Sequence, residues 1–196
     1  MASYTLITNA TATPDSGDWS VSDGGTIHAA LASVAGAYVQ TGATGKDFRV
    51  DFTAPVIDAT GQETIDSIQA CITANTFNTR SETANVRIDI EDGGNSNSDY
   101  FTDTHTILVN GGNLGTYCSD VKTTSDGGST AWTASDLDSI RMMGEVTSFS
   151  GTCDVLISYA YIIVLTSIPI ATYTSDDQVT LSGGTLELRN GKVVIG

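Results

Sequence analysis

Side chains suited to acid–base or nucleophilic catalysis are scarce in this sequence. Among its 196 residues there are two histidines, His28 and His105. His105 follows Asp103 by two positions, so both side chains share one face if the segment is a β-strand. A Ser-His-Asp triad also needs a serine presented on a sharp strand-to-helix turn, and the sequence contains no such turn. We therefore interpret His105 as a solvent-facing strand residue.

A pair of carboxylates, Asp89 and Glu91, lies in a segment that alternates strictly between apolar and polar residues. On a β-sandwich, two carboxylates on one strand face can serve as the acid and base of glycoside hydrolysis. Arg87 shares that face, however, and strict alternation is typical of a half-buried strand with a wet, charge-mixed outer side. The sequence therefore predicts no catalytic residue, and a carbohydrate-active enzyme that uses this pair is the remote alternative.

The loop between Asp92 and Asp99 carries oxygen-bearing side chains at alternate positions, the ligand type that calcium prefers. It lacks the spacing and the terminal bidentate glutamate of an EF-hand. Further acidic residues are Asp120, Asp126, Asp176 and Asp177. Calcium at this loop is kept as an alternative to a solvated turn. The sequence otherwise predicts no metal site and no cofactor.

The two tryptophans, Trp19 and Trp132, each lie beside a turn-like segment. Exposed tryptophans stack on sugar rings and would indicate a glycan-binding site. The other interpretation is that each closes the rim of a hydrophobic core.

The charge balance restricts the partners. Eight Lys and Arg face 23 Asp and Glu, for a net charge of −15. Such a chain repels phosphate backbones and anionic lipids, so neither nucleic acid nor a membrane is an expected partner. The acidity fits solubility, a salty medium, or a basic docking partner.

Three cysteines cannot all pair within one chain. Cys71 lies inside an apolar run, where a small buried thiol is expected. Cys118 and Cys153 lie at strand edges and can form a disulfide, which the sequence does not decide. We expect three free thiols and synthesis in a reducing compartment.

The first ten residues show no basic segment followed by an apolar stretch, so we expect no signal peptide. The longest apolar run, residues 155–165, is about half of the roughly 20 residues that a membrane helix needs. The expected location is the cytoplasm during synthesis.

Alternation with a period of two dominates the chain and predicts antiparallel strands separated by Gly- and Asn-rich loops. Expected strands cover residues 48–52, 65–74, 85–91, 104–109, 140–146 and 155–165. Residues 27–35 form the one helix-like stretch, of a turn or two. The predicted fold is an all-β, jelly-roll-like antiparallel sandwich over residues 1–168.

The run at residues 155–165 is apolar on both faces, which is typical of a strand covered on both sides. Its second face would be covered by a loop or by a neighbouring subunit. Exposed Ile163 and Leu165 on a monomer would promote aggregation. The run therefore indicates either a homo-oligomer or cover from within the chain.

Beyond Pro169 the composition changes. Three short strands are expected near residues 179–181, 185–188 and 193–195, with turns at Gly183-Gly184 and Asn190-Gly191. We expect residues 169–196 to be a C-terminal β-meander arm that docks on another surface, because three strands of this size are marginally stable alone.

The order of these landmarks resembles β-sandwich modules of tailed-bacteriophage virions, found in head decoration proteins and in fibre or tail appendages. The resemblance covers about residues 15–168, and its most specific piece is the Trp-Thr-x-x-Asp-Leu-Asp turn at residues 132–138. Tyr159 and Tyr161 stand on the final strand, where the usual versions are rich in arginine.

The resemblance implies a non-enzymatic virion component, first of all a capsid-surface decoration protein. Its partners would be copies of itself and the major capsid protein or other virion proteins. The alternative is a tail or fibre component that binds a host-surface glycan. Deleting residues 169–196 is expected to leave a folded sandwich that no longer assembles.

Overall fold

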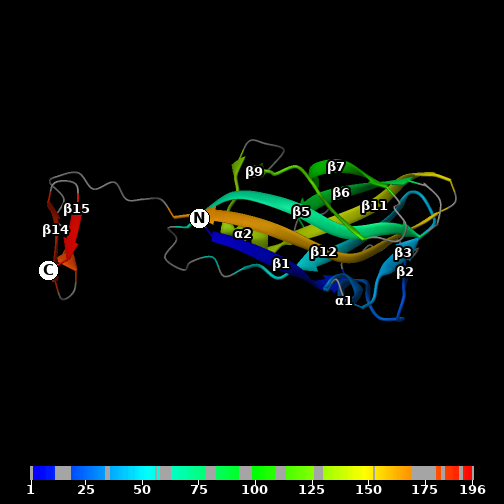
Figure 1. The fold of residues 1–196 in the computed structure, drawn as a ribbon, viewed down its shortest axis with the longest axis horizontal. Helices are drawn as coiled ribbons and strands as arrows, with labels where there is room; N and C mark the ends of the chain where they lie inside the picture. The colour runs from blue at the N-terminus through cyan, green and yellow to red at the C-terminus, as the bar shows by residue number, and fades with distance from the viewer. Residues whose placement is uncertain are drawn as a thin grey trace.

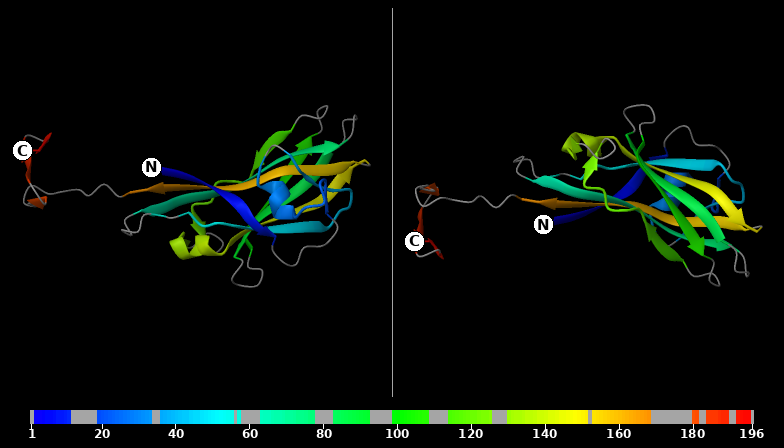
Figure 2. Two further views of the ribbon diagram at one scale, coloured as in Figure 1. Left: turned by 90° about the horizontal axis from the view of Figure 1, so that it is seen from below. Right: turned by 90° about the horizontal axis from the view of Figure 1, so that it is seen from above.

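The computed structural model describes residues 2–11, 19–33, 36–55, 57, 63–77, 83–92, 99–108, 114–125, 130–151, 153–168, 180–181, 184–189 and 192–195. Over residues 2–168 the strands stack in two layers around one hydrophobic core (Figures 1 and 2). The predicted antiparallel β-sandwich is confirmed.

One layer, which we call the β12 sheet, is built around β12 (Asp154–Ser167). β12 pairs with β5 (Thr64–Phe77) on one side, and with β3 (Val39–Thr41) and then β1 (Ala2–Thr11) on the other. β8 (Gly115–Cys118) extends the sheet beyond β5, and β2 (Ser20–Val21) extends it beyond β3. The apolar run at residues 155–165 is therefore a central strand, as its composition predicts.

The other layer, the β11 sheet, is built around β11 (Ile140–Ser150). β11 lies between β4 (Lys46–Phe52) and β6 (Thr83–Asp92), and β7 (Asp99–Leu108) pairs with β6. Each of these strands contains a segment predicted from alternation. A separate two-stranded ribbon, β9 (Thr124–Ser125) and β10 (Thr130–Ala131), falls where the sequence predicts only a loop.

β1 belongs to both sheets. Residues 2–7 pair with β12, and after an irregularity between Thr8 and Ala10 the strand pairs with β4. This strand is not predicted from the sequence, because the inward residues Tyr4, Leu6 and Thr8 include a polar one while the outward Ile7 is apolar, which leaves no clear apolar rhythm.

The core forms where the inward residues of the two sheets meet. Phe48 is fully buried, and its ring lies over Gly144 on the adjacent strand, where an added Cβ would come within 2.5 Å of two ring carbons. Gly144 therefore leaves the space that the ring occupies, and a larger residue there would force the core apart.

Two short helices connect the strands. α1 (Ile27–Leu31) lies within residues 27–35, where a helix of a turn or two is expected. α2 (Ala134–Asp138) corrects the expectation of one helix-like stretch. The Asp136 carboxylate accepts hydrogen bonds from the Thr133 N–H at 2.7 Å and from the Thr133 hydroxyl at 2.8 Å, which stabilises the start of α2.

The expectation of three free thiols is wrong, and so is the alternative pairing of Cys118 with Cys153. Cys71 and Cys118 form a disulfide, while Cys153 is buried outside it. The reason is the antiparallel pairing of β5 with β8, which sets Cys71 directly opposite Cys118, with their Cα atoms 4.1 Å apart. This pairing joins segments separated by 47 residues, so it is a product of the tertiary fold.

At the C-terminus, β13 (Thr180–Leu181), β14 (Gly184–Arg189) and β15 (Lys192–Ile195) form a three-stranded antiparallel sheet. The three predicted strands are confirmed. No helix in the described part of the chain is long and apolar enough to cross a membrane.

Candidate binding surface

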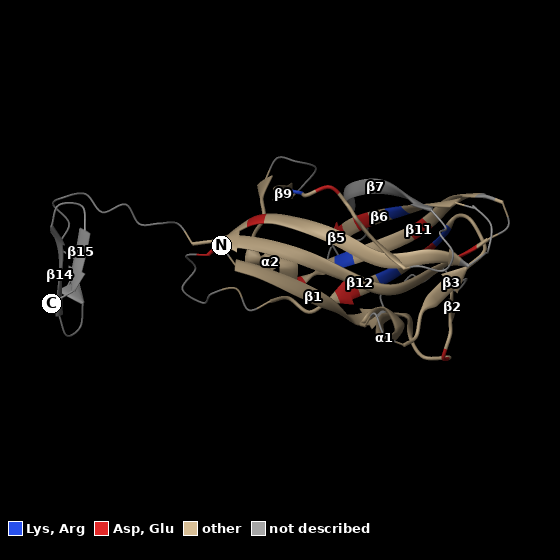
Figure 3. Ribbon diagram, in the orientation of Figure 1, with Lys and Arg blue, Asp and Glu red and all other residues tan. Residues whose placement is uncertain are grey.

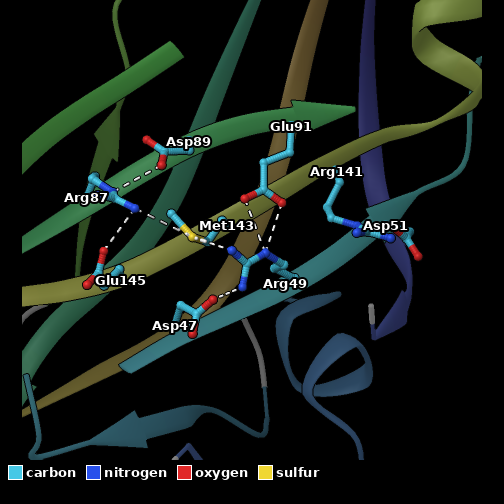
Figure 4. A network of polar contacts seen from close by, with 9 residues as sticks. All are labelled: Asp47, Arg49, Asp51, Arg87, Asp89, Glu91, Arg141, Met143 and Glu145. Atoms are coloured by element: carbon cyan, nitrogen blue, oxygen red, sulfur yellow. Dashed lines mark hydrogen bonds and ion pairs between the residues drawn. The ribbon is translucent and has the colours of Figure 1, made fainter. Parts of the chain in front are cut away.

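The outer face of the β11 sheet carries a network of charged side chains (Figure 4). It comprises Asp47, Arg49 and Asp51 on β4, Arg87, Asp89 and Glu91 on β6, and Arg141, Met143 and Glu145 on β11. Alternation on three paired strands produces this arrangement, because the intervening residues face the core.

Arg49 occupies the middle of the network (Figure 4). Its Nε donates to the two carboxylate oxygens of Glu91 at 3.2 and 3.0 Å, and its Nη1 forms an ion pair with Asp47. Its Nη2 lies 3.2 Å from the sulfur of Met143. The guanidinium thus joins all three strands.

The other two arginines also pair with carboxylates, one within its own strand β6 and two across strands. Arg87 lies 3.1 Å from Asp89 and 3.0 Å from Glu145, and Arg141 Nε donates to Asp51 at 2.8 Å. Carboxylates outnumber guanidinium groups in the network, so this face stays acidic.

This geometry corrects the prediction of a wet outer face. The side chains of Asp89 and Glu91 are 0% and 1% exposed, and each lies against an arginine. Both Glu91 oxygens already accept from Arg49. An open groove of about 330 Å³ at the end of this face is lined by Asp51 and Arg141 among others, and neither Asp89 nor Glu91 lines it. The arrangement suits a structural role better than acid–base chemistry.

The other candidate chemistry is placed only in part. The backbone register sets His105 opposite Val86 and Asp103 opposite Ile88; their side chains lie outside the described structure. Residues 93–98 of the proposed calcium loop also lie outside it, as do Asp126, Asp176 and Asp177. Within the described residues, no three His, Cys, Asp or Glu side chains are grouped to hold a metal ion.

Neither tryptophan is available for stacking on a sugar. Trp19 is 6% exposed and packs edge-on against Phe48, with ring centroids 5.1 Å apart. Trp132 is 4% exposed, and its Nε1 donates to the Lys122 carbonyl at 3.1 Å. Both close the core, which confirms the second interpretation of these residues.

The outer face of the β12 sheet has a different character. Its central stripe is Tyr159, Tyr161, Ile163 and Leu165 of β12, all partly exposed. Register places Ser3, Thr5 and Ile7 of β1 on one side of the stripe, and Ser67, Gln69, Cys71 and Thr73 of β5 on the other. Cys118 and Thr116 of β8 complete it. We call this set of residues the β12 face.

The β12 face contains no Asp, Glu, Lys, Arg or His. Figure 3 shows β1 and β12 free of acidic and basic residues along most of their length. The acidic residues of β5 and β12, Asp66 and Asp154, lie near the ends of these strands. In a chain of net charge −15 such a neutral sheet face stands apart from the rest of the surface.

One large apolar side chain of the β12 face is well exposed. Ile7, on β1 opposite Tyr161, is 47% exposed. The other exposed large apolar residues in the described structure, Leu114, Val121 and Ile168, lie next to β8 or β12. Sequence reasoning identified Ile163 and Leu165 but missed Thr5 and Ile7, since β1 itself was not predicted.

Tyr159 and Tyr161 stack on each other, with ring centroids 4.7 Å apart and planes inclined by 26°. Partial burial, and to a smaller extent the neighbouring Tyr159, raise the pKa of Tyr161 above 10.0. Stacking covers one side of each ring. It does not form a coplanar aromatic platform.

The fold and its two contrasting faces define the molecule as an antiparallel β-sandwich with a neutral, partly apolar sheet face. No family model and no curated protein matches the chain.

Among solved structures, the chain is similar to a CBM36-1 domain of a multidomain xylanase from the hindgut metagenome of Trinervitermes trinervoides. The identity is 11%, the TM-score 0.39, and the match covers 83% of this chain and 96% of that one. It is also similar to the CBM22-1–GH10 modules of a Clostridium thermocellum xylanase, at 10% identity, a TM-score of 0.37 and coverage of 87% and 30%. Likenesses of this size carry no argument about function.

Proposed function

We propose that this chain is a non-catalytic structural protein of a tailed-bacteriophage virion that decorates the outside of the head shell. The observation that carries the proposal is the β12 face, a neutral sheet surface with exposed Ile7 in an otherwise acidic chain. Contiguous exposed apolar surface is typical of sites where proteins assemble. The landmarks at residues 15–168 support the same class of protein.

The ion pairs of Asp89 and Glu91 with arginines favour a structural role over catalysis. Asp89 and Glu91 are buried in contact with Arg87 and Arg49, so they stabilise the sheet and do not meet solvent. An acid–base pair needs access to a substrate. We therefore assign no catalytic residue.

Counting copies in intact particles tests the location. A decoration protein is present on the order of hundreds of copies per head, whereas a tail component is present in about a dozen or fewer, as the symmetry of each part requires. Quantitative mass spectrometry against the major capsid protein gives the ratio. Absence from purified particles would contradict a virion role.

A tail or fibre component that binds a host-surface glycan is the second candidate. The hydroxyl groups of Thr5 and Thr116 share the β12 face with two tyrosines, which is chemistry that suits an uncharged sugar. Migration through gels containing host polysaccharide tests it. This candidate expects retardation that Tyr159→Ala abolishes and Thr147→Ala, on the other sheet, leaves intact.

A further inference from the structure

We propose that a second copy of this chain docks on the β12 face, so that two copies form a two-fold dimer with Tyr161 near the axis. The inference deepens the proposed structural role and rests on it. It names the occupant of the face and the residues that make the contact.

Charge is the first argument. Two copies, each with a net charge of −15, repel each other through most of their surfaces. The outer face of the β11 sheet is acidic, since its carboxylates outnumber its arginines. The β12 face has no charged side chain between the irregularities of the β12–β5 pairing at Ile157/Tyr159 and Leu165/Thr166. It is the described sheet face on which two copies meet with the least repulsion.

Symmetry is the second argument. β12 is the central strand, flanked at Tyr161 by Cys71 on one side and Ile7 on the other. A two-fold axis that crosses the strands near Tyr161 makes the two copies of β12 run antiparallel and sets Ile163 of each copy against Tyr159 of the other. Two regular sheet faces pack in this way with interdigitating side chains.

The size of the face predicts the strength of the contact. Four strands spaced about 4.8 Å apart, over about seven residues at roughly 3.3 Å each, span at most about 20 by 23 Å. Ser67, Cys71 and Thr73 of β5 are buried within this area, so the accessible part is smaller. That footprint is smaller than the roughly 800 Å² per partner of a standard interface. The dimer is therefore reversible and concentration-dependent.

Salt gives a distinctive signature. Because the face itself is neutral, the electrostatic contribution to dimerisation is the repulsion between the two acidic molecules. Salt screens that repulsion, so the dimer tightens as the ionic strength rises. An interface held by ion pairs would weaken instead.

The test uses the full chain and two matched variants. Thr5 is exposed on the β12 face, and Thr147 is exposed on β11 of the other sheet. Thr5→Glu places an added negative charge from each copy in the interface, whereas Thr147→Glu adds the same charge outside it. Sedimentation velocity from about 1 to about 300 μM, in about 0.05 and 0.5 M NaCl, gives the dissociation constants.

We expect the wild-type chain and Thr147→Glu to dimerise alike, more tightly at high salt, and Thr5→Glu to dimerise at least about tenfold more weakly. Circular dichroism confirms that both variants are folded. A wild-type chain that stays monomeric, equal dissociation constants for the two variants, or dissociation by salt would each overturn the dimer.

Binding of the same proteins to purified heads separates this inference from the proposed function. A monomeric wild-type chain that still decorates heads refutes the dimer and leaves the virion role intact. A dimer that is absent from virions supports the interface and refutes the virion role. Loss of head binding in Thr5→Glu without any change in its dimerisation would assign the face to the capsid and overturn the dimer.

Discussion

Arg49 and Glu91 show how burial changes the role of a charged residue. On an open strand face such a pair contributes little, because water competes for both groups. Here the Glu91 side chain is 1% exposed, and the Arg49 Nε lies 3.0 Å from its nearer carboxylate oxygen. The pair therefore behaves as part of the interior, although it lies on the outer side of a sheet.

Arg49→Met is expected to lower the free energy of unfolding by about 3–5 kcal/mol, because it leaves a buried carboxylate without its counterion. Urea denaturation measures the change. Arg141→Met is the matched control: its partner Asp51 is 34% exposed, so the loss should be about 1 kcal/mol or less. The double variant Arg49→Met/Glu91→Met should recover most of the loss, and equal losses for the two single variants would contradict this account.

Tyr161 provides a prediction at alkaline pH. Its pKa in the folded chain is raised above 10.0, mainly by burial, so the unfolded chain loses this proton first. The contribution of neutral Tyr161 to the free energy of unfolding is fully present below pH 10. It is lost as the pH rises through the pKa that Tyr161 has in the folded chain. We expect the melting temperature of Tyr161→Phe, measured between about pH 9 and 11, to fall less than that of the wild-type chain. Equal falls in melting temperature for the two chains would show that Tyr161 does not contribute to the pH dependence of stability.

At the scale of elements, strands with a strong apolar rhythm are predictable from the sequence, and their partners are not. Residues 85–91 alternate cleanly and form the centre of β6. β1 was missed, because its inward face mixes Tyr4 and Thr8 with Leu6. Of the β12 face, the sequence predicts only the apolar outer side of residues 155–165, since pairing with β1, β5 and β8 is decided by the whole fold.

The link between β5 and β8 is the element-scale prediction. Cys118→Ser removes a cross-link between residues 47 apart, which should lower the free energy of unfolding by about 2–4 kcal/mol. Reductant should lower the melting temperature of the wild-type chain and leave that of the variant unchanged. Thiol titration of the unfolded wild-type chain should count one reactive cysteine, and a count of three would contradict the disulfide.

At the scale of the whole molecule, the C-terminal three-stranded sheet is hydrogen-bonded only within itself among the described strand pairings. Deleting residues 169–196 should therefore leave the melting temperature of the sandwich nearly unchanged, while attachment to virion particles is lost. Calorimetry and co-sedimentation with purified heads measure the two effects. A truncated chain that still attaches fully would show that the arm is not required for assembly.

Because β1 pairs with strands of both sheets, it also affects the timing of folding. β1 pairs Ala2 with Thr166 and Ile7 with Tyr161, so its partner strand β12 is made more than a hundred residues later, about ten seconds or more at ordinary elongation rates. Until then the β12 sheet lacks its central strand, and the core around Leu6 is incomplete. Closure of the sandwich therefore depends on contacts of very long sequence separation, which makes it slow. During that interval the nascent chain exposes its apolar strands to chaperones and to other nascent copies on the same messenger RNA.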